Sequence, residues 1–246
     1  MVDMHRHLPQ VGEPSLEQDW IIWFATSDTS EWNRMTEAPH NQLYRHGYGI
    51  LPQSISHERL VEPDMITNLA SILDTTLGNN PLGYVGEIGL DVRFENDISS
   101  ETQFSLAYEL MQIAKRRGRP TVIHHIGPMP RLERLLEEVQ PSTPTIIHGY
   151  VKSVESARRL ADLGATISLG PTVWTHKTKL SEHLAKLDVP FLLETDYPFV
   201  SASLHDAYGY DTLCSTHLHR ISELMGRNIG EIEEQVYGQA TLFTHW

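Results

Sequence analysis

The chain has 246 residues, with 19 Lys and Arg against 32 Asp and Glu, so its formal net charge is −13 when histidine is neutral. This acidic balance argues against a broad nucleic-acid footprint, which needs clustered basic side chains, although a small phosphate-bearing substrate at a metal centre stays compatible with it. A single cysteine, Cys214, excludes an intramolecular disulfide framework and suits a reducing compartment.

Eight short apolar runs are predicted to be β-strands. Several, such as residues 20–25 and 120–124, are almost continuously apolar, which is typical of strands buried on both faces of a parallel sheet. In chain order the predicted strands are Val2–His5, Trp20–Ala25, Gly47–Leu51, Gly83–Ile88, Pro120–His124, Thr145–Gly149, Ala165–Leu169 and Pro190–Leu193.

Amphipathic helical patterns separate most of these strands. In Glu101–Arg117 apolar residues recur at helical spacing, and basic residues gather at the C-terminal end, where the helix dipole favours them. The predicted helices are Glu62–Leu77, Glu101–Arg117, Pro130–Val139, Ser153–Leu163, Leu180–Leu187, Asp211–Met225 and Gly230–Phe243.

Repeated alternation of strand and helix predicts parallel strands joined by right-handed crossovers. The expected fold class is α/β, a (β/α)8 TIM barrel that forms a single domain over residues 1–246. Only residues 8–19 join the first two strands, which barely accommodates a crossover helix, so a distorted first unit is expected. The sequence shows no signal peptide and no apolar run long enough to cross a membrane, so we expect a cytoplasmic protein.

Residues of metal-binding types lie at or just past the ends of these strands, which meet at one open mouth in a barrel. His5 and His7 are two residues apart on the first strand, so both imidazoles face the same side while Arg6 points away. His124 and His148 end the fifth and sixth strands in the similar contexts PTVIH and PTIIH. We predict these four histidines to be metal ligands.

Two carboxylates extend this candidate site. Glu87, on the fourth strand, has two oxygens that can bridge two cations, as two-metal hydrolases require; otherwise only one metal binds, because no lysine ends a middle strand. Asp196 follows the eighth strand, which neighbours the first in a closed barrel. It can bind the His5/His7 ion and accept a proton from a water whose pKa the metal lowers toward about 7. We therefore predict Asp196 and Glu87 to be catalytic.

The motifs VDMHRHL, GEIGLD, VIH, IIHGY and ETDYP occur in this order over almost the entire chain. As a set they resemble the TatD family of metal-dependent hydrolases, within the amidohydrolase-like barrels. The resemblance implies a phosphodiesterase or deoxyribonuclease that needs two divalent ions (Zn²⁺, Mg²⁺ or Mn²⁺) and acts on DNA or a small phosphodiester. Carried over by position, one ion would be held by His5, His7, Glu87 and Asp196, and the other by Glu87, His124 and His148.

Outside this expected metal shell the chain departs from the family's pattern. After the fifth strand the family usually has H-x-R-D-A, whereas this chain reads HHIGP over residues 124–128 and lacks the arginine. After the third strand, Leu51 stands where the family usually has a histidine. Loss of the arginine removes bidentate phosphate recognition, which weakens the case for DNA more than the case for hydrolysis. Further candidates at the mouth are Arg93, Trp174, His176, Lys177 and His205.

Two other functions stay open at this stage. The same metals can hydrolyse a C–N or C–O bond in a small molecule, which the missing arginine and the acidic composition favour. A non-catalytic descendant that binds a ligand or a partner protein is the third alternative. Six converging polar groups argue against it, because an idle site has no physical reason to keep them. The sequence predicts neither the exact substrate nor an oligomeric state.

Overall fold

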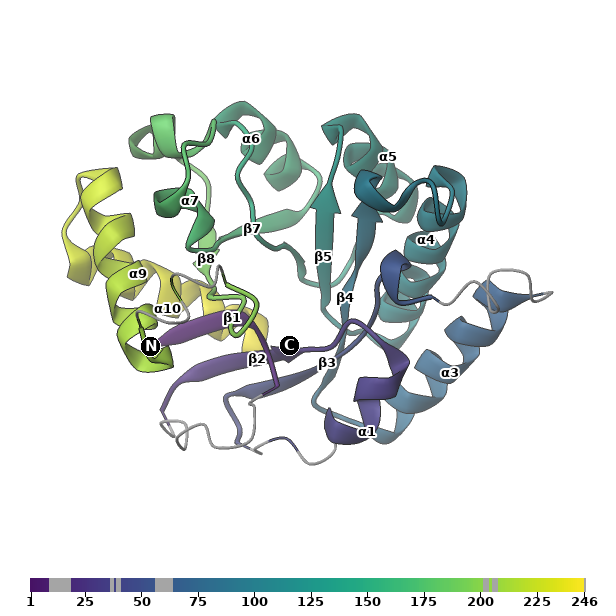
Figure 1. Cartoon of the computed structure of the whole chain (residues 1–246). Coiled ribbons are helices and arrows are strands. Elements are labelled where there is room, and N and C mark those ends of the chain that lie inside the picture. The colour runs from purple at the N-terminus through teal and green to yellow at the C-terminus, as the bar shows by residue number, and fades with distance from the viewer. Residues whose placement is uncertain are drawn as a thin grey trace.

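The computed structural model describes residues 1–8, 19–35, 38, 41–55, 64–200, 204 and 208–245. Within them, eight parallel strands form one sheet in the order β1 to β8, and helices surround it (Figure 1). The strands are β1 (Val2–His7), β2 (Ile21–Ala25), β3 (Tyr44–Ile50), β4 (Gly83–Asp91), β5 (Thr121–Ile126), β6 (Thr145–Ile147), β7 (Ala165–Leu169) and β8 (Phe191–Leu193). This nearly closed barrel confirms the predicted (β/α)8 fold.

The helices largely follow the predicted spans. The α-helices are α1 (Trp32–Met35), α3 (Met65–Asn79), α4 (Ser100–Arg117), α5 (Met129–Val139), α6 (Val154–Asp162), α7 (Thr172–Thr175), α9 (Tyr210–Met225) and α10 (Ile229–Thr244). The 3₁₀ helices are η1 (Thr29–Glu31), η2 (Pro52–Ser54), η3 (Val92–Phe94) and η4 (Ser181–Lys186). The α-helix expected over residues 180–187 was wrong: η4 stands there, and the non-helical backbone of His183 (φ −133°) interrupts it.

Three strands run further than their apolar cores predict. β1 continues to His7, β4 to Asp91 and β5 to Ile126, because β4 and β5 keep pairing through Leu90–His125 and Asp91–Ile126. Glu87 and His124 therefore lie within strands rather than at strand ends. Of the expected short first crossover, over residues 8–19, residues 9–18 lie outside the described residues. The β1–β2 pairing does shift register between Asp3 and Arg6.

The segment after β8 joins the last strand to the first. The Asp196 N–H donates to the His5 carbonyl oxygen at 2.9 Å, and the His7 N–H donates to the Tyr197 carbonyl oxygen at 2.8 Å. The Asp3 carboxylate adds two bonds, accepting from the backbone N–H and the hydroxyl of Thr195 at 2.9 and 2.6 Å. These contacts bring Asp196, near the C-terminus in sequence, beside the histidines of β1.

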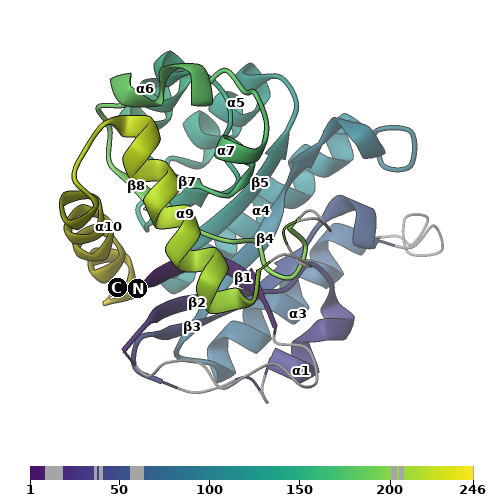
Figure 2. The same ribbon diagram turned by 60° about the vertical axis from the view of Figure 1, so that its left-hand side comes forward.

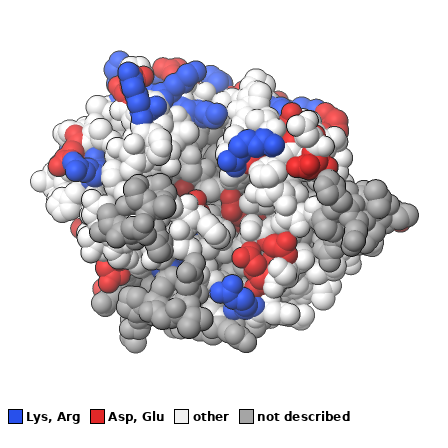
Figure 3. Space-filling model, viewed as in Figure 1, with Lys and Arg blue, Asp and Glu red and all other residues white. Residues whose placement is uncertain are grey.

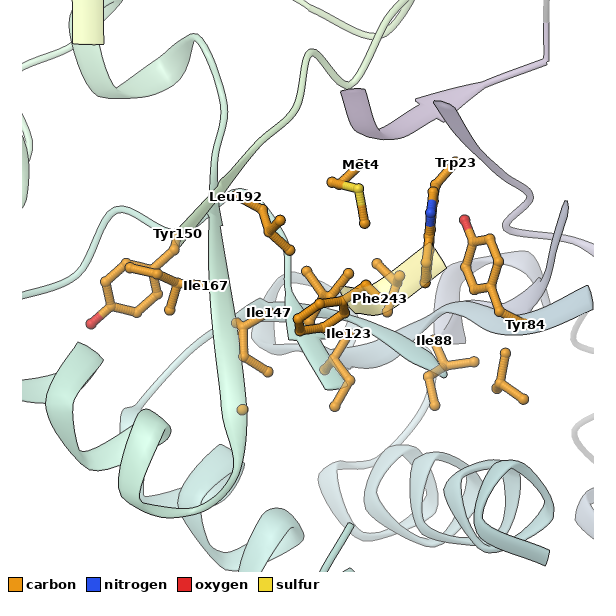
Figure 4. Close-up of a cluster of buried hydrophobic side chains, with 14 of the residues drawn as sticks. Met4, Trp23, Tyr84, Ile88, Ile123, Ile147, Tyr150, Ile167, Leu192 and Phe243 are labelled. Carbon is orange, nitrogen blue, oxygen red and sulfur yellow. The ribbon is translucent and has the colours of Figure 1, made fainter. Parts of the chain in front are cut away.

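A continuous apolar core links the strands to the helices, and Figure 4 shows part of it, from Met4 on β1 to Phe243 on α10. Figure 2 shows α9 and α10 along the side of the barrel where β1 and β8 meet. Trp23 on β2 packs 4.7 Å from the Tyr84 ring and donates from Nε1 to Thr244 Oγ1 at 3.3 Å. Burial of one large apolar side chain contributes about 1.5–3 kcal/mol. None of the described helices is long and apolar enough to cross a membrane.

Candidate metal centre

The alternation of β1 places two histidines together at the mouth of the barrel. The His5 and His7 rings stand edge to face with centroids 5.4 Å apart, and both side chains are buried. Arg6 points to the other side, where its guanidinium lies 4.0 Å from the Tyr210 ring centroid. The predicted orientation of these three side chains is therefore confirmed.

A hydrogen bond between β4 and the end of β2 positions Glu87. The Glu87 N–H donates to the carbonyl oxygen of Thr26 at 2.8 Å, although β3 lies between these two strands. This bond passes beside Gly49 of β3, where an added Cβ would lie 2.1 Å from both Glu87 N and Thr26 O. The absence of a side chain at Gly49 is thus what lets Glu87 reach its place.

One oxygen of Glu87 faces the histidines of β1. Glu87 Oε2 lies 3.7 Å from His5 Nε2 and 3.8 Å from His7 Nε2. Asp196 Oδ1 lies 3.6 Å from His5 Nε2 and 3.5 Å from His7 Nε2. The structure therefore gathers these four side chains, drawn from both ends and the middle of the chain, into a first group.

The other oxygen of Glu87 faces the histidines of β5 and of the turn after β6. Glu87 Oε1 lies 3.0 Å from His124 Nδ1 and 2.7 Å from His148 Nε2, and these two nitrogens are 3.0 Å apart. His148 also stacks on His5 at a centroid distance of 4.1 Å. Glu87 is therefore shared by two adjacent groups of candidate ligands, and all six predicted residues converge.

The spacing and burial of these atoms fit metal ions. Two ligand atoms on a tetrahedral or octahedral ion with bonds of about 2.1 Å stand roughly 3.0–3.4 Å apart. The candidate ligand atoms of this centre lie between 2.7 and 3.8 Å from one another, which spans that spacing. His5 is fully buried, and neither of its ring nitrogens has a hydrogen-bond partner among the described residues. A buried polar atom without a partner costs about 1–3 kcal/mol, and an ion beside Nε2 would satisfy one of the two.

Electrostatics keep the carboxylates ionised. Burial works to raise the pKa of Glu87, but His148 and His124 outweigh it and hold that pKa well below its ordinary value. At Asp196, partial desolvation works to raise the pKa, and the contacts with His7 and His5 lower it overall. Burial and the adjacent His148 lower the pKa of His5 to about 4, so its imidazole is neutral at pH 7. Burial works to lower the pKa of His148, but Glu87 and Glu194 raise it well above its ordinary value. Because ionised carboxylates and neutral imidazoles are the forms that bind metals, this histidine would release its proton when a cation binds.

Two further carboxylates orient the histidines of the second group. Asp91 Oδ2 lies 3.1 Å from His124 Nε2, on the side of the ring away from Glu87. Glu194 Oε1 lies 3.4 Å from His148 Nδ1 and accepts the Gly149 N–H at 2.7 Å. Such partners fix the ring orientation of metal-binding histidines. Sequence reasoning missed Asp91, although it ends the GEIGLD motif.

The centre opens into a pocket of about 200 Å³, and Figure 3 shows acidic atoms within the central hollow of this face. Its wall also includes Gln53 and Phe199, which sequence reasoning did not single out. The Phe199 side chain is 65% exposed and its ring stands edge to face with His7 at 4.5 Å. A neighbouring pocket of about 90 Å³ shares Asp196 and Phe199. The mouth therefore has room for a substrate larger than its reacting group.

Two of the further candidates at the mouth, Arg93 and Lys177, are paired with carboxylates. Arg93 donates to both oxygens of Asp91, with an Nη2–Oδ2 distance of 2.6 Å. Lys177 Nζ lies 3.0 Å from Glu182 Oε1. Both pairs form between residues close in the sequence, so the two cations are partly neutralised before any substrate arrives.

The remaining candidates at the mouth have different surroundings. Trp174 donates from Nε1 to His217 Nδ1 at 2.8 Å, so it supports helix α9. His176 is exposed and lines the pocket beside Asp196, whereas His205 lies outside the described residues. Cys214 is buried in α9, and burial raises the pKa of its thiol well above the ordinary value, as suits a core residue.

The chain is similar to known metal-dependent hydrolases over most of its length. The family model described as TatD related DNase matches residues 2–243. An uncharacterized metal-dependent hydrolase, YjjV of Escherichia coli, is 34% identical over 116 residues, which cover 46% of this chain and 44% of YjjV. An uncharacterized metal-dependent hydrolase of Haemophilus influenzae is 29% identical over 219 residues, 80% of each chain. The alignment with YjjV thus spans less than half of that relative.

Solved structures show the same fold. The crystal structure of E. coli YjjV, a TatD homolog, superposes with a TM-score of 0.76 at 23% identity, covering 90% of this chain and 85% of that one. A TatD family hydrolase from Entamoeba histolytica superposes with a TM-score of 0.74 at 14% identity, covering 98% and 97% of the two chains.

Proposed function

Because the chain belongs to the TatD-related family of metal-dependent hydrolases, we propose that it hydrolyses phosphodiesters with two divalent ions. The proposal depends above all on Glu87, whose Oε2 faces His5 and His7 while its Oε1 faces His124 and His148. A carboxylate with its two oxygens directed at separate ligand groups is suited to bridge two cations, the arrangement that serves in-line displacement at phosphorus.

The protein side chains then have separate tasks. Divalent ions at this centre would supply Lewis acidity toward phosphate oxygens and acidify a water molecule for attack. Asp196 lies open to the mouth with a lowered pKa, so its ionised carboxylate can accept the proton that this water releases. Both oxygens of Glu87 face histidines, so this side chain would hold the ions as a shared ligand rather than act as a base.

Hydrolysis of a C–N or C–O bond in a small molecule is the second candidate. The pairing of Arg93 with Asp91 and of Lys177 with Glu182 favours it, because these cations are less available to a phosphate. The net charge of −13 points the same way, since it opposes the approach of large anions.

A parallel substrate assay tests the proposal. Protein loaded in turn with Mg²⁺, Mn²⁺ or Zn²⁺ would be offered bis(p-nitrophenyl) phosphate, single- and double-stranded oligodeoxynucleotides, amides and lactones. We expect the diesters to be hydrolysed, and Asp196→Asn to lower the rate by about 10²–10⁴ fold, as loss of a general base does. Asp211→Asn, at an exposed site on α9, serves as the matched control.

Three outcomes would contradict parts of this proposal. Turnover limited to amides or lactones would replace it with the second candidate. Full activity of Asp196→Asn would remove the proton-accepting role. Metal analysis that finds no bound ion, with no activity after metal is added, would favour a non-catalytic binding protein.

A further inference from the structure

A second concave site lies beside the metal centre, on the loops that follow β6 and β7. It is a groove of about 300 Å³, and its polar lining comprises Lys152, Ser153, Ser156, Thr178 and Lys179. We call it the Lys152/Lys179 groove. No carboxylate lines it among the described residues. Two positive charges and three hydroxyl groups on one concave surface make it chemically complementary to an oxyanion.

The fold places this groove next to the candidate metal centre. Lys152 lies only four residues after His148, so both belong to the connection between β6 and α6. The apolar part of the groove includes Met129, at the start of α5, which follows the strand that carries His124. The groove and the centre therefore share one face of the barrel. On that face basic atoms gather near α6, whereas acidic atoms occupy the hollow (Figure 3).

The charge of the two groove lysines is not neutralised within the described part of the chain. Neither Lys152 nor Lys179 forms an ion pair with a described carboxylate, in contrast to Lys177, which is paired with Glu182. An anion in this groove would be attracted by both ammonium groups. The chain as a whole has a net charge of −13 and therefore repels anions. A cationic groove would attract an anion locally in spite of that charge.

The hydroxyl groups can supply directional hydrogen bonds. Ser153 Oγ accepts from the Ser156 N–H at 3.2 Å, and Thr178 Oγ1 accepts from the Ser181 N–H at 3.0 Å. These bonds hold both oxygens in place. The Thr178 hydroxyl keeps its proton for donation, whereas the Ser153 and Ser156 Oγ atoms lie 3.3 Å apart, so one of their two protons is used within that pair and the other is left for an anion. Lysine charges with neighbouring hydroxyl donors suit the several acceptor oxygens of a phosphate.

We propose that the Lys152/Lys179 groove binds a second, non-scissile phosphate of the substrate while the scissile phosphate occupies the metal centre. This inference rests on the proposed phosphodiesterase function and narrows it. The preferred substrate class is then a phosphodiester that carries a further phosphate group, such as a short nucleotide chain, rather than an isolated diester. The groove supplies the phosphate contacts that Arg93 and Lys177 do not.

A comparison of two substrates tests the proposal. Dithymidine monophosphate carries one phosphate, whereas its terminally phosphorylated form carries two. We expect the parent protein to prefer the second by about ten-fold or more in kcat/KM, the range expected when hydrogen bonds to a charged group are gained. The double variant Lys152→Met, Lys179→Met should lose that preference through a higher KM. Lys186→Met, which changes an exposed lysine outside the groove, should keep it. Equal preference in the parent and the double variant would overturn the proposal.

A binding experiment separates failure of this inference from failure of the proposed function. Fluorescein-labelled tetrathymidylate would be titrated against the metal-loaded protein in an Asp196→Asn background, with fluorescence anisotropy as the readout. Weaker binding and a smaller salt dependence when both groove lysines are replaced would support the phosphate site even if no diester is hydrolysed. Identical binding with and without them would refute the site, even if diesters are hydrolysed.

Discussion

The substitution Gly49→Ala is expected to disturb the centre without touching any candidate ligand. The added methyl group would lie 2.1 Å from Glu87 N and from Thr26 O, where ordinary contact begins at 3.4 Å. Both neighbours are backbone atoms, so no side-chain rotation can relieve the clash. Either β2 or β4 must move by roughly 1 Å, a shift that costs stability in a close-packed interior.

The size of this effect follows from two contributions. Overpacking of a well-packed core costs about 1–3 kcal/mol, and loss of the buried bond between Glu87 N–H and Thr26 O costs about 1–3 kcal/mol more. A total of about 2–6 kcal/mol is a large share of the roughly 5–15 kcal/mol that stabilises a typical domain. Displacement of Glu87 would also move its two oxygens away from both ligand groups, so the ions proposed for this centre should bind more weakly.

Urea unfolding of the metal-free protein measures the first effect, and metal content after dialysis measures the second. Gly238→Ala is the matched control, because Gly238 is an exposed position of α10 with no neighbouring atom within 4 Å of the added Cβ. That change should stabilise the protein by about 0.5–1 kcal/mol, since alanine favours helix. An unaltered unfolding midpoint and full metal content for Gly49→Ala would refute this account of the site.

Three further expectations follow from the contacts. Asp91→Asn should lower the affinity for one of the two proposed ions by about 10–100 fold in a metal titration. The substitution leaves His124 poorly oriented, while the other ligand group keeps its residues. An equal loss of affinity for both ions would contradict this. Burial lowers the pKa of His217 from 6.5 to about 4. Below pH 6.5 the unfolded chain therefore takes up a proton at this residue, while the folded protein does so only near pH 4. The free energy of unfolding should accordingly be highest above pH 6.5 and fall by about 3 kcal/mol as the pH decreases to 4. Between pH 4 and pH 7, the urea midpoint of His217→Gln should therefore depend less on pH than that of the parent protein. The exposed control His219→Gln should keep the pH dependence of the parent protein. Removal of metal by a chelator should lower the unfolding free energy by about 2.7 kcal/mol if the ions had been present at 100 times their Kd, and an unchanged thermal midpoint would argue against bound metal.

The sequence predicted the fold because each strand is a short apolar run, and the helices between the strands carry apolar residues at helical spacing. It placed the strand ends less well at β4 and β5. Apolar character stops near Ile88 and Ile123, but the backbone pairing of Leu90 with His125 carries both strands on. The expected helix over residues 180–187 was wrong for a related reason, because local periodicity does not reveal the interrupted backbone at His183.

Residue types and strand order alone were enough to predict which side chains converge, because alternation on β1 and the closure of a barrel follow from the pattern. Only the tertiary structure decided the contacts that connect distant parts of the chain. The division of Glu87 between two ligand groups and the support of His124 by Asp91 both depend on how the strands of the barrel are placed relative to one another. Sequence spacing constrains neighbours along one strand, whereas distances of 3–4 Å between strands are set by the close packing of the whole barrel.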